Sequence, residues 1–430
     1  MLSIKNLKNE IKEKQLIEII NESLREYKKI HKVLIVHPDY TRFDFTNKLA
    51  PLILKTLRER NLKELHFLCA NGTHRKMTEL EFHYKLGIHE EKGLIFFYNH
   101  EFDCPERLAE IGEIPSNFVS EKTNGFLTNG IPITINKLVL DENDLIIVIS
   151  STTPHEASGY SGGLKTFSPG ISGPEVIDLF HWAATLIGIP EIIGNVNNPA
   201  REIINLGSSF LFNRDAPMLS FNMVADESDM KPIPKGLFVG AGYDGFIEAY
   251  EEASMLSSKL HVKYIEKPIN TAVQEIPRYY DEIWTAAKGS YKLQKPGVIS
   301  KNGEIIIFAP HVKCFHSNPT MNKYIMDIGY HCKEYVHNFL ESNPNFCRNV
   351  AAHVINFRGT GHFNKIIGSE EFAFKLTLAT GIPKDICRAV GLNYKDPNSI
   401  NREDYCDSDR IWIQDGGKYL FDLKKKMKAD

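Results

Sequence analysis

The chain contains 430 residues, and at roughly 150 residues per domain this length suggests two or three domains. Its 51 basic and 54 acidic residues give a formal charge of −3, so the composition offers no basic field for a nucleic-acid partner. Apolar residues never run uninterrupted for the roughly 18 positions that a membrane-spanning helix needs. We therefore expect neither a nucleic acid nor a membrane as a partner.

The cysteines and the N-terminal segment predict a cytoplasmic protein. The seven cysteines are scattered and form no CxxC pair, which argues against a zinc ribbon or a disulfide framework. The first residues, MLSIKNLKNEIKEKQ, lack the apolar core of a signal peptide. We expect reduced thiols that mostly fill the core, and Cys69 is the only one beside a loop of interest.

The first part of the chain alternates predicted strands and helices. Residues 3–29 place apolar side chains at helical spacing amid dense charge, which predicts one or two surface helices. An apolar, β-branched run at 32–39 predicts a strand, and residues 46–61 predict an amphipathic helix. The same strand, loop and helix recur over 62–87. This alternation favours a mainly parallel sheet covered by helices on both faces.

A third predicted strand, at 144–150, leads into a glycine-rich segment at 151–173. The helix after it begins near Pro174 and ends at Gly188. This helix carries His181, and a histidine on an amphipathic helix is usually a core residue. Because the chain has no HExxH motif and no pair of histidines at helical spacing, residue spacing alone predicts no metal site.

The second part of the chain repeats the alternation. A helix is predicted at about 243–260, and apolar runs at 303–311, 351–357 and 385–392 are expected to be strands with helices between them. The fold class that we predict is α/β, with two α/β domains, mainly parallel sheets and a cofactor and substrate cleft between the domains.

We expect the chain to cross between the domains within residues 261–273. The N-terminal, cofactor-binding domain then covers residues 1–265, and the C-terminal domain covers residues 266–409. The tail of about residues 410–430 ends in a run of charge and is a candidate to pack back on the first domain.

Three predicted strand ends carry loops that are rich in reactive side chains. They read HPDYTR at 37–42, NGTHR at 71–75 and STTPHEASGYSGGLK at 151–165. Ligands of open α/β sheets bind at the carboxyl ends of the strands, so neighbouring strands would bring these loops into one crevice. The crevice would collect Asp39, Thr41, Arg42, His74, Arg75, His155 and Lys165.

The glycine-rich loop at 159–166, GYSGGLKT, nearly spells the phosphate-binding pattern GxxxxGK[ST]. Leu164 stands where that pattern requires glycine, so the chain lacks a true P-loop. A glycine-rich loop with free backbone N–H groups could still cradle a phosphate. A phosphate- or nucleotide-binding α/β enzyme that uses Gly159 to Thr166 therefore remains an alternative.

Together these motifs resemble the lactate racemase family, whose enzymes use a nickel-pincer nucleotide. The motifs are DYTR, GTHR and PHEASGYSGGLKTFSPGISG, each after a predicted strand. The resemblance runs from about residue 33 to residue 205 and resumes weakly around 284–310. Its most specific part is the series His155, Lys165 and His181, with intervals of ten and sixteen residues.

The resemblance implies an isomerase that inverts the α-carbon of a 2-hydroxy acid. It implies that Lys165 is joined covalently to the cofactor, pyridinium-3,5-bisthiocarboxylic acid mononucleotide with nickel. Ser161, Gly162 and Gly163 would contact this cofactor, and His181 would be the protein ligand of nickel. Enzymes that synthesise the cofactor would then be partners of the chain.

On the substrate side, the resemblance implies that His74 and His155 are the acid–base residues. It places Asp39 and Arg42 in the substrate pocket, and Lys288, in WTAAKG, resembles the lysine that meets the substrate carboxylate. Histidines titrating near neutrality suit proton transfer, and guanidinium and ammonium groups suit a carboxylate. The hydride store must be a cofactor, because no side chain can serve as one.

The chain departs from the lactate-type members at one substrate position. Those members have a glutamine three residues before the pocket lysine, where this chain has Thr285. We therefore expect Thr285 in the pocket and a 2-hydroxy acid with a side chain larger than methyl as the substrate. A non-catalytic homologue that binds a hydroxy acid is a further alternative, and the presence of both His74 and His155 counts against it.

Overall fold

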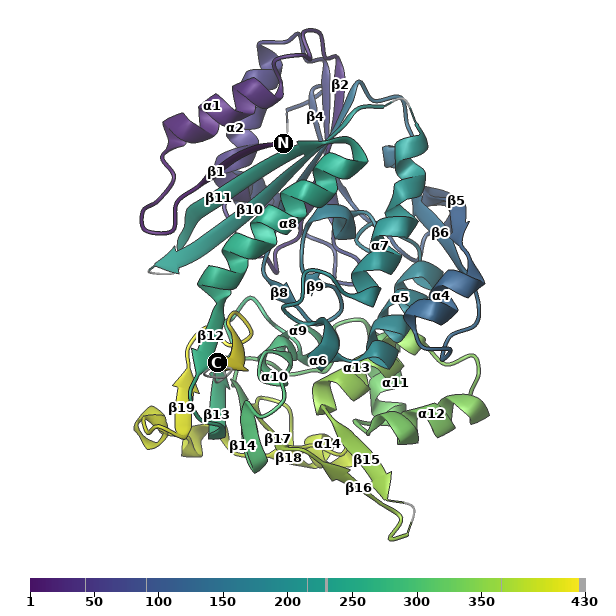
Figure 1. Cartoon of the computed structure of the whole chain (residues 1–430), viewed down its shortest axis with the longest axis vertical. Coiled ribbons are helices and arrows are strands. Elements are labelled where there is room, and N and C mark those ends of the chain that lie inside the picture. Colours follow the sequence, from purple (N-terminus) through teal and green to yellow (C-terminus); the bar gives the residue numbers. More distant parts are fainter. Residues whose placement is uncertain (43, 90, 215, 229–230, 365, 425–430) are drawn as a thin grey trace, which may run out of the picture. The chain divides into compact units, whose positions relative to one another are not determined.

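The computed structural model folds into two compact units (Figure 1). The first unit comprises residues 1–180 and 195–260, and the second comprises residues 181–194 and 261–430. The structure describes residues 1–42, 44–89, 91–214, 216–228, 231–364 and 366–424. Among these residues, no helix combines the length and the apolar character needed to cross a membrane.

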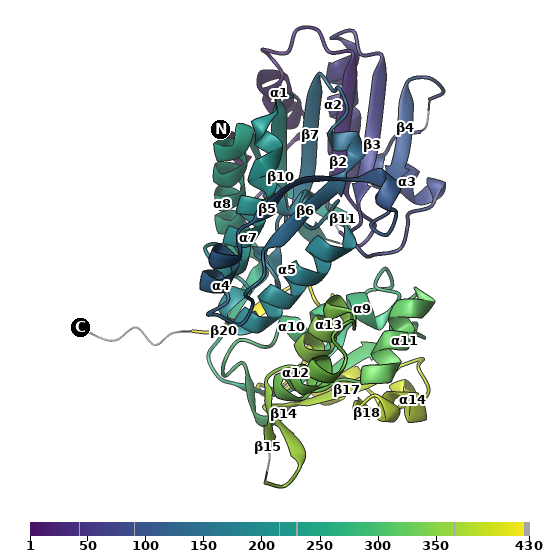
Figure 2. The ribbon, with the colours of Figure 1, turned by 90° about the vertical axis from the view of Figure 1, so that its right-hand side faces the viewer.

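A seven-stranded sheet of order β1-β11-β10-β7-β2-β3-β4 forms the centre of the first unit. Its strands are Leu2–Lys5 (β1), Lys32–Pro38 (β2), Glu64–Ala70 (β3), Ile95–Asn99 (β4), Leu145–Ser151 (β7), Met218–Ser228 (β10) and Lys231–Ala241 (β11). The run from β10 to β4 is parallel, and β11 pairs antiparallel with β10 on one side and with β1 on the other. Figure 2 shows β7, β2, β3 and β4 side by side. The predicted mainly parallel α/β fold is confirmed.

Both faces of this sheet are covered, which explains the continuous apolar runs in the sequence. Alternate residues of β2, such as Val33 and Ile35, pack in a core with the helices Glu13–Ser23 (α1), Thr46–Arg58 (α2) and Glu79–Leu86 (α3). On the opposite face, Val224 and Phe238 pack against the helix Gly242–His261 (α8). Central strands such as β2 and β7 therefore bury side chains on both sides.

The glycine-rich segment follows β7 and holds only short elements. These are the strands Pro154–His155 (β8) and Gly159–Tyr160 (β9) and a 3-10 turn at Gly163–Thr166. The remaining elements from this part of the chain are Leu108–Ile114 (β5), Ser116–Lys122 (α4), Ile131–Asn136 (β6), Pro174–Ile187 (α5), Ile189–Ile192 (α6) and Pro199–Ser209 (α7). The boundary between the two units falls inside α5, because residues 181–194 belong to the second unit.

The second unit contains a five-stranded, fully parallel sheet of order β18-β17-β14-β13-β19. Its strands are Ile269–Glu275 (β13), Ile299–Ala309 (β14), Lys375–Thr380 (β17), Asn393–Tyr394 (β18) and Arg410–Ile413 (β19). Its helices are Ile283–Ala286 (α9), Lys288–Tyr291 (α10), Pro319–Ile328 (α11), Lys333–Ser342 (α12), Arg348–Arg358 (α13) and Lys384–Ala389 (α14). Two further strand pairs are Val262–Ile265 (β12) with Leu420–Leu423 (β20), and Gly361–Asn364 (β15) with Ser369–Phe372 (β16).

The C-terminal tail contributes strands to the second unit. β19 pairs with β13 in the five-stranded sheet, and β20 pairs with β12. Residues 425–430, the end of the tail that was a candidate to pack on the first domain, lie outside the described residues.

Two sequence predictions about secondary structure are wrong, and a third is right only in part. Residues 351–357, expected as a strand, lie in α13, and the run at 385–392 begins within α14. Nearly every residue of α13 is buried, so its apolar run lacks the one-sided periodicity that identifies a surface helix. At the N-terminus, α1 is the surface helix expected within 3–29, but the first residues form the strand β1, because Leu2–Lys5 pairs with β11.

Candidate active site

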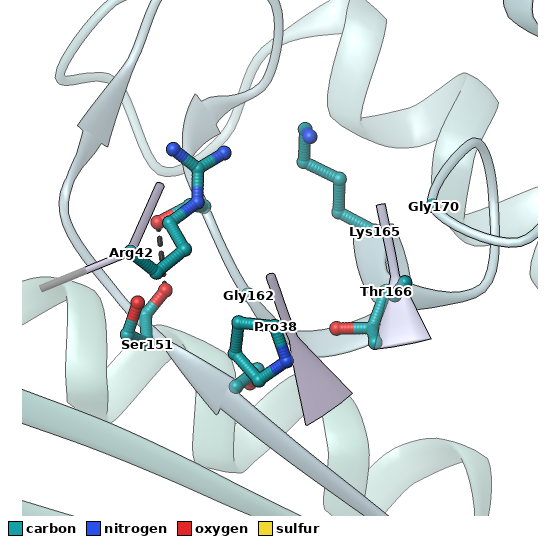
Figure 3. Close-up of a pocket in the computed structure, with 10 residues that line it drawn as sticks. Pro38, Arg42, Ser151, Gly162, Lys165, Thr166 and Gly170 are labelled. Atoms are coloured by element: carbon teal, nitrogen blue, oxygen red, sulfur yellow. Dashed lines mark hydrogen bonds between the residues drawn. The ribbon is translucent and has the colours of Figure 1, made fainter. Parts of the chain in front are cut away.

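The loops that follow β2, β3 and β7 come together at one edge of the first sheet. β2 lies between β3 and β7, and Pro38 pairs with Ala70 at the ends of their strands. A pocket opens at this edge, and Figure 3 shows Arg42 and Lys165 extending in the same direction from its lining. The lining residues are Pro38, Arg42, Ala70, Ser150, Ser151, Ser161, Gly162, Lys165, Thr166 and Gly170.

The buried Asp39 and the half-buried His74 form a pair beside this pocket. Nδ1 of His74 lies 2.5 Å from Oδ2 of Asp39. The other carboxylate oxygen of Asp39 accepts hydrogen bonds from the backbone N–H of Thr41 at 3.0 Å and from its hydroxyl at 2.6 Å. Both Asp39 oxygens are therefore engaged, and the carboxylate fixes the orientation of the His74 ring.

The surroundings of Asp39 keep it ionised. Burial acts to raise the pKa of this carboxyl, but its charged and hydrogen-bonding neighbours together outweigh burial, and the charge and hydrogen bond of His74 contribute most among them. The positive charge of Arg42 and the hydrogen bond from Thr41 act in the same direction as His74. The pKa of Asp39 is thus held well below its usual range, and a carboxylate faces His74 at neutral pH.

Lys165 is half-buried, and its side-chain amine has no hydrogen-bond partner among the described residues. Burial lowers the pKa of Lys165 to about 7. The positive charges of Arg42 and Arg201 lower this pKa further, and the negative charges of Glu156 and Asp39 oppose them. A substantial share of the Lys165 amine is consequently unprotonated near neutral pH, which is the form that acts as a nucleophile.

Glycine is required at two positions just before Lys165. Gly162 and Gly163 have φ angles of 85° and 60°, in the left-handed region that favours glycine. A Cβ at Gly162 would lie 3.0 Å from the hydroxyls of Ser150 and Thr152. The sequence GG is therefore needed for the sharp turn that directs Lys165 into the pocket.

The loop's own polar groups are largely used to hold its fold. The N–H of Gly163 donates to Ser150 Oγ at 3.1 Å and to Asn222 Oδ1 at 3.0 Å. The hydroxyl of Ser161 donates to the carbonyl of Ser151 at 2.7 Å and accepts from the N–H of Thr153. These contacts tie the loop to β7 and β10.

A residue that no sequence motif identified supports the loop from α7. The guanidinium of Arg201 donates to the carbonyl oxygens of Ser158, Tyr160 and Gly162, at 3.3, 2.5 and 3.3 Å. The only sequence signal was an arginine within the stretch NPAREII, near the end of the family resemblance.

His155 lies on β8, in the same segment as Lys165. It is 7% exposed, and its Nδ1 accepts a hydrogen bond from the N–H of Ala157 at 3.2 Å. Its Nδ1 is also 3.6 Å from a carboxylate oxygen of Glu156, whose charge acts on Lys165. Because Nδ1 accepts, a neutral His155 carries its proton on Nε2.

Arg75, a further member of the predicted crevice, and the nearby Cys69 both have local partners within the first unit. Arg75 forms a two-pronged ion pair with Glu81 at the start of α3 and lies 4.0 Å over the ring of Tyr40. Cys69 is fully buried, and burial raises the pKa of its thiol well above the ordinary value. Cys69 therefore fills the core, as the sequence predicted for most of the thiols.

The remaining predicted site residues belong to the second unit. His181 is half-buried in α5. Thr285, in α9, is fully buried and donates its hydroxyl to the carbonyl of Glu282 at 3.1 Å. Lys288, in α10, places its Nζ 4.6 Å from the centre of the Tyr280 ring. Across the described parts of both units, no group of three or more His, Cys, Asp or Glu residues could hold a metal ion.

Comparisons of the sequence link the first unit to one family. The family model described as the lactate racemase N-terminal domain matches residues 3–188. Lactate racemase from Thermoanaerobacterium thermosaccharolyticum is 31% identical over 160 residues, which are 36% of this chain and 33% of that protein. Lactate racemase from Lactiplantibacillus plantarum is 28% identical over 155 residues, 35% of this chain and 32% of that protein. The matched stretch thus spans about one third of each curated relative.

Comparisons of structure extend over the whole chain. A crystal structure of a protein from Thermotoga maritima has a TM-score of 0.94 and 52% sequence identity, covering 98% of this chain and 100% of that one. The lactate racemase apoprotein from Thermoanaerobacterium thermosaccharolyticum has a TM-score of 0.69 at 18% identity, covering 97% of this chain and 94% of that one. At this identity, the second match shows a shared fold.

Proposed function

We propose that this chain, whose residues 3–188 match the lactate racemase N-terminal domain, is a racemase or epimerase of 2-hydroxy acids. The observation that carries the proposal is Lys165, an amine with a pKa of about 7 in a pocket beside the Asp39–His74 pair. An unprotonated amine suits covalent attachment of a cofactor, and an oriented histidine suits proton transfer.

The proposed cofactor is the nickel-pincer nucleotide, attached through Lys165, with His181 as the protein ligand of nickel. Attachment is supported by the lowered pKa of Lys165 and by the absence, within the described chain, of a hydrogen-bond partner for its amine. Ser161, Gly162 and Gly163 would lie beside the attached group, since they form the turn that precedes Lys165. When bound, the cofactor would supply the hydride acceptor that no side chain can provide.

The hydrogen bonds of the two histidines suit opposite roles in proton transfer. Asp39 stays ionised and accepts from Nδ1 of His74, which leaves Nε2 of His74 free to take the hydroxyl proton of the substrate. His155 accepts at Nδ1, so its Nε2 holds a proton that can be returned to the same oxygen. For the opposite enantiomer the two roles would be exchanged.

Charged side chains would bind the substrate carboxylate. The Arg42 guanidinium has no side-chain hydrogen bond within the described chain and lines the pocket next to Lys165. Lys288 would supply an ammonium group, as the resemblance in WTAAKG implies. The hydroxyl of Thr285 is directed to the Glu282 carbonyl, so Thr285 would present less polar surface than the glutamine of lactate-type members. We therefore propose a substrate with a side chain larger than methyl, such as a polar sugar acid.

The test is the inversion of single enantiomers by protein produced together with the cofactor-synthesis enzymes. Each pure 2-hydroxy acid of a panel ordered by size is incubated with the protein, and chiral chromatography follows the appearance of the opposite configuration. We expect inversion, with a higher kcat/KM for a larger acid than for lactate. If lactate has the highest kcat/KM, the argument from Thr285 is wrong. If cofactor-bearing protein inverts no acid of the panel, the non-catalytic alternative replaces the proposal.

The alternative of a phosphate cradle at residues 159–166 has less support. The N–H of Gly163 donates to Ser150 and Asn222, and the N–H of Ser161 donates to the carbonyl of Thr153. Two of the N–H groups that would bind a phosphate are therefore already engaged within the protein.

A further inference from the structure

The three side-chain hydrogen bonds of Arg201 all go to the glycine-rich loop. It lies on α7, is 3% exposed, and donates one hydrogen bond from each of its three nitrogens. The acceptors are the carbonyl oxygens of Ser158, Tyr160 and Gly162, alternate residues of the segment that leads to Lys165. One rigid guanidinium thus fixes three successive points of this segment.

Tyr250, on α8, completes this arrangement from the other side. The guanidinium carbon of Arg201 lies 3.7 Å over the centre of the Tyr250 ring. The Tyr250 hydroxyl donates to the carbonyl of Ser158 and accepts from the N–H of Tyr160, both at 3.3 Å. A Cβ built on Gly163 would lie 3.1 Å from Cβ of Tyr250, so the loop packs directly on this side chain.

The charge of Arg201 is costly to bury, because no carboxylate is among its hydrogen-bond partners in the described chain. Removing an ion from water costs several kcal/mol, and three carbonyl dipoles and a ring face offset that cost here. The buried Arg201 cation also makes the electrostatic potential at Lys165 more positive, which lowers the pKa of the Lys165 amine.

We propose that Arg201, stacked on Tyr250, is a positioning residue that holds the glycine-rich loop in the shape that presents the Lys165 amine to the pocket. The role assigned to Lys165 rests on the proposed function, whereas the contacts of Arg201 do not. Without Arg201, the three carbonyl oxygens lose their donor, and the turn at Gly162 and Gly163 loses its support on the α7 side.

The experiment measures the reactivity of Lys165 in the full-length chain without cofactor. Trace labelling with acetic anhydride between pH 5 and pH 10, followed by peptide mass spectrometry, gives the pH profile of this amine. Hydrogen exchange of residues 158–166 reports the order of the loop. The variants are Arg201→Met, Arg201→Lys and Tyr250→Phe. The matched control is Arg60→Met, because Arg60 also donates to backbone carbonyls, those of Leu24 and Thr56, but outside this loop.

We expect the wild-type labelling profile to have its midpoint near pH 7. Loss of the Arg201 cation favours the protonated amine, as does a loop that opens Lys165 to water. Arg42 still lowers the pKa of Lys165 in the variant, and Glu156 and Asp39 still oppose it. A rise of one pH unit in the midpoint corresponds to a reduction of about tenfold in labelling at pH 7. Arg201→Met should show this change together with faster exchange at 158–166.

The other variants separate charge from geometry. Arg201→Lys keeps the charge but cannot reach three carbonyls. Hydrogen exchange at 158–166 should therefore remain as fast as in Arg201→Met, while the midpoint of Lys165 labelling should lie between those of Arg201→Met and wild type. Tyr250→Phe removes the two hydrogen bonds of the Tyr250 hydroxyl and keeps the ring. This milder variant tests the proposal even if Arg201→Met does not fold. Its exchange at 158–160 should be faster than in wild type. Wild-type exchange and labelling in Tyr250→Phe and Arg201→Met, or equal changes in Arg60→Met, would overturn the proposal.

This experiment measures no catalysis and uses no cofactor, so it is independent of the proposed function. A chain that inverts no hydroxy acid but shows the shift of Lys165 in Arg201→Met would retain the positioning role and lose the racemase assignment. A chain that inverts hydroxy acids but whose Lys165 labelling profile is unchanged in Arg201→Met would retain the racemase assignment and lose the positioning role of Arg201.

Discussion

Replacing Asp39 with asparagine should disable the acid–base pair while leaving the loop fold almost intact. Asparagine keeps one side-chain oxygen, which can still accept both hydrogen bonds from Thr41. Its amide group takes the place of the oxygen that faces Nδ1 of His74. An amide N–H can only donate there, so Nδ1 must lose its proton and Nε2 must carry it. The variant histidine then no longer offers a basic nitrogen to the substrate hydroxyl.

The size of both effects follows from these contacts. One hydrogen bond to a charged group is lost, which is worth about 1.5–3 kcal/mol of stability when the group is buried. The inversion rate should fall by about 10²- to 10⁴-fold, the usual contribution of an oriented acid–base group. The folded-state pKa of Asp39 is depressed, so its contribution to stability is present above the unfolded-state pKa of about 3.9. That contribution is lost as the pH falls through the lower, folded-state pKa.

The assay must report on the first unit. The three tryptophans, at positions 182, 284 and 412, all belong to the second unit, so their fluorescence does not follow Asp39. Hydrogen exchange of peptides that cover β2 and the loop after it gives the local free energy of opening. The difference between wild type and Asp39→Asn should decrease below about pH 4, as the Asp39 carboxylate becomes protonated.

Asp44→Asn is the matched control for this variant. Asp44 is also buried and accepts from the N–H and hydroxyl of the threonine two residues later, at 3.0 and 2.6 Å. Its second oxygen pairs with Lys85 at 3.0 Å instead of a histidine. Asp44→Asn should therefore lose stability but retain most of the inversion rate. Equal losses of rate in both variants, or a rate in Asp39→Asn within a few-fold of wild type, would refute the role of Asp39 in orienting His74.

The cofactor and the second histidine provide three further predictions. Lys165→Ala, produced with the cofactor-synthesis enzymes, should have the intact mass of the bare chain and an unchanged circular dichroism spectrum, and an added mass on this variant would contradict the attachment site. His181→Ala should keep the organic cofactor mass but lose tightly held nickel, and an unchanged nickel content by metal analysis would require another ligand. His155→Ala should lower inversion of a single enantiomer, followed by polarimetry, by about 10²- to 10⁴-fold. A loss of only a few-fold would exclude His155 as an acid–base residue.

The sequence predicted the first unit well because its strands and polar loops are local patterns. Asp39 and His74 are 35 positions apart, yet each follows a buried strand, and adjacent parallel strands end at the same edge. Their contact could therefore be expected from strand order. The role of Arg201 could not, because its partners lie about 40 positions away and include only backbone oxygens, which carry no sequence signature.

The errors in the second unit have a related cause. α13 is buried over most of its surface, so its sequence AAHVINF is as apolar as a strand, and periodicity cannot distinguish the two. The sequence did not predict β1 because the strand is short and only partly buried. It has only four residues, and its pattern of alternating exposure is visible only once β11 is known to lie beside it.

The short strand β1 also protects the chain from self-association. It occupies the outer edge of the first sheet and pairs with residues 236–239 of β11, a segment that includes Leu237, Phe238 and Val239. If residues 2–5 were removed, the hydrogen-bonding groups of that apolar strand would face solvent and could pair with another chain. Cleavage after Lys5 should thus increase edge-to-edge aggregation of the protein, although the pocket residues are unchanged.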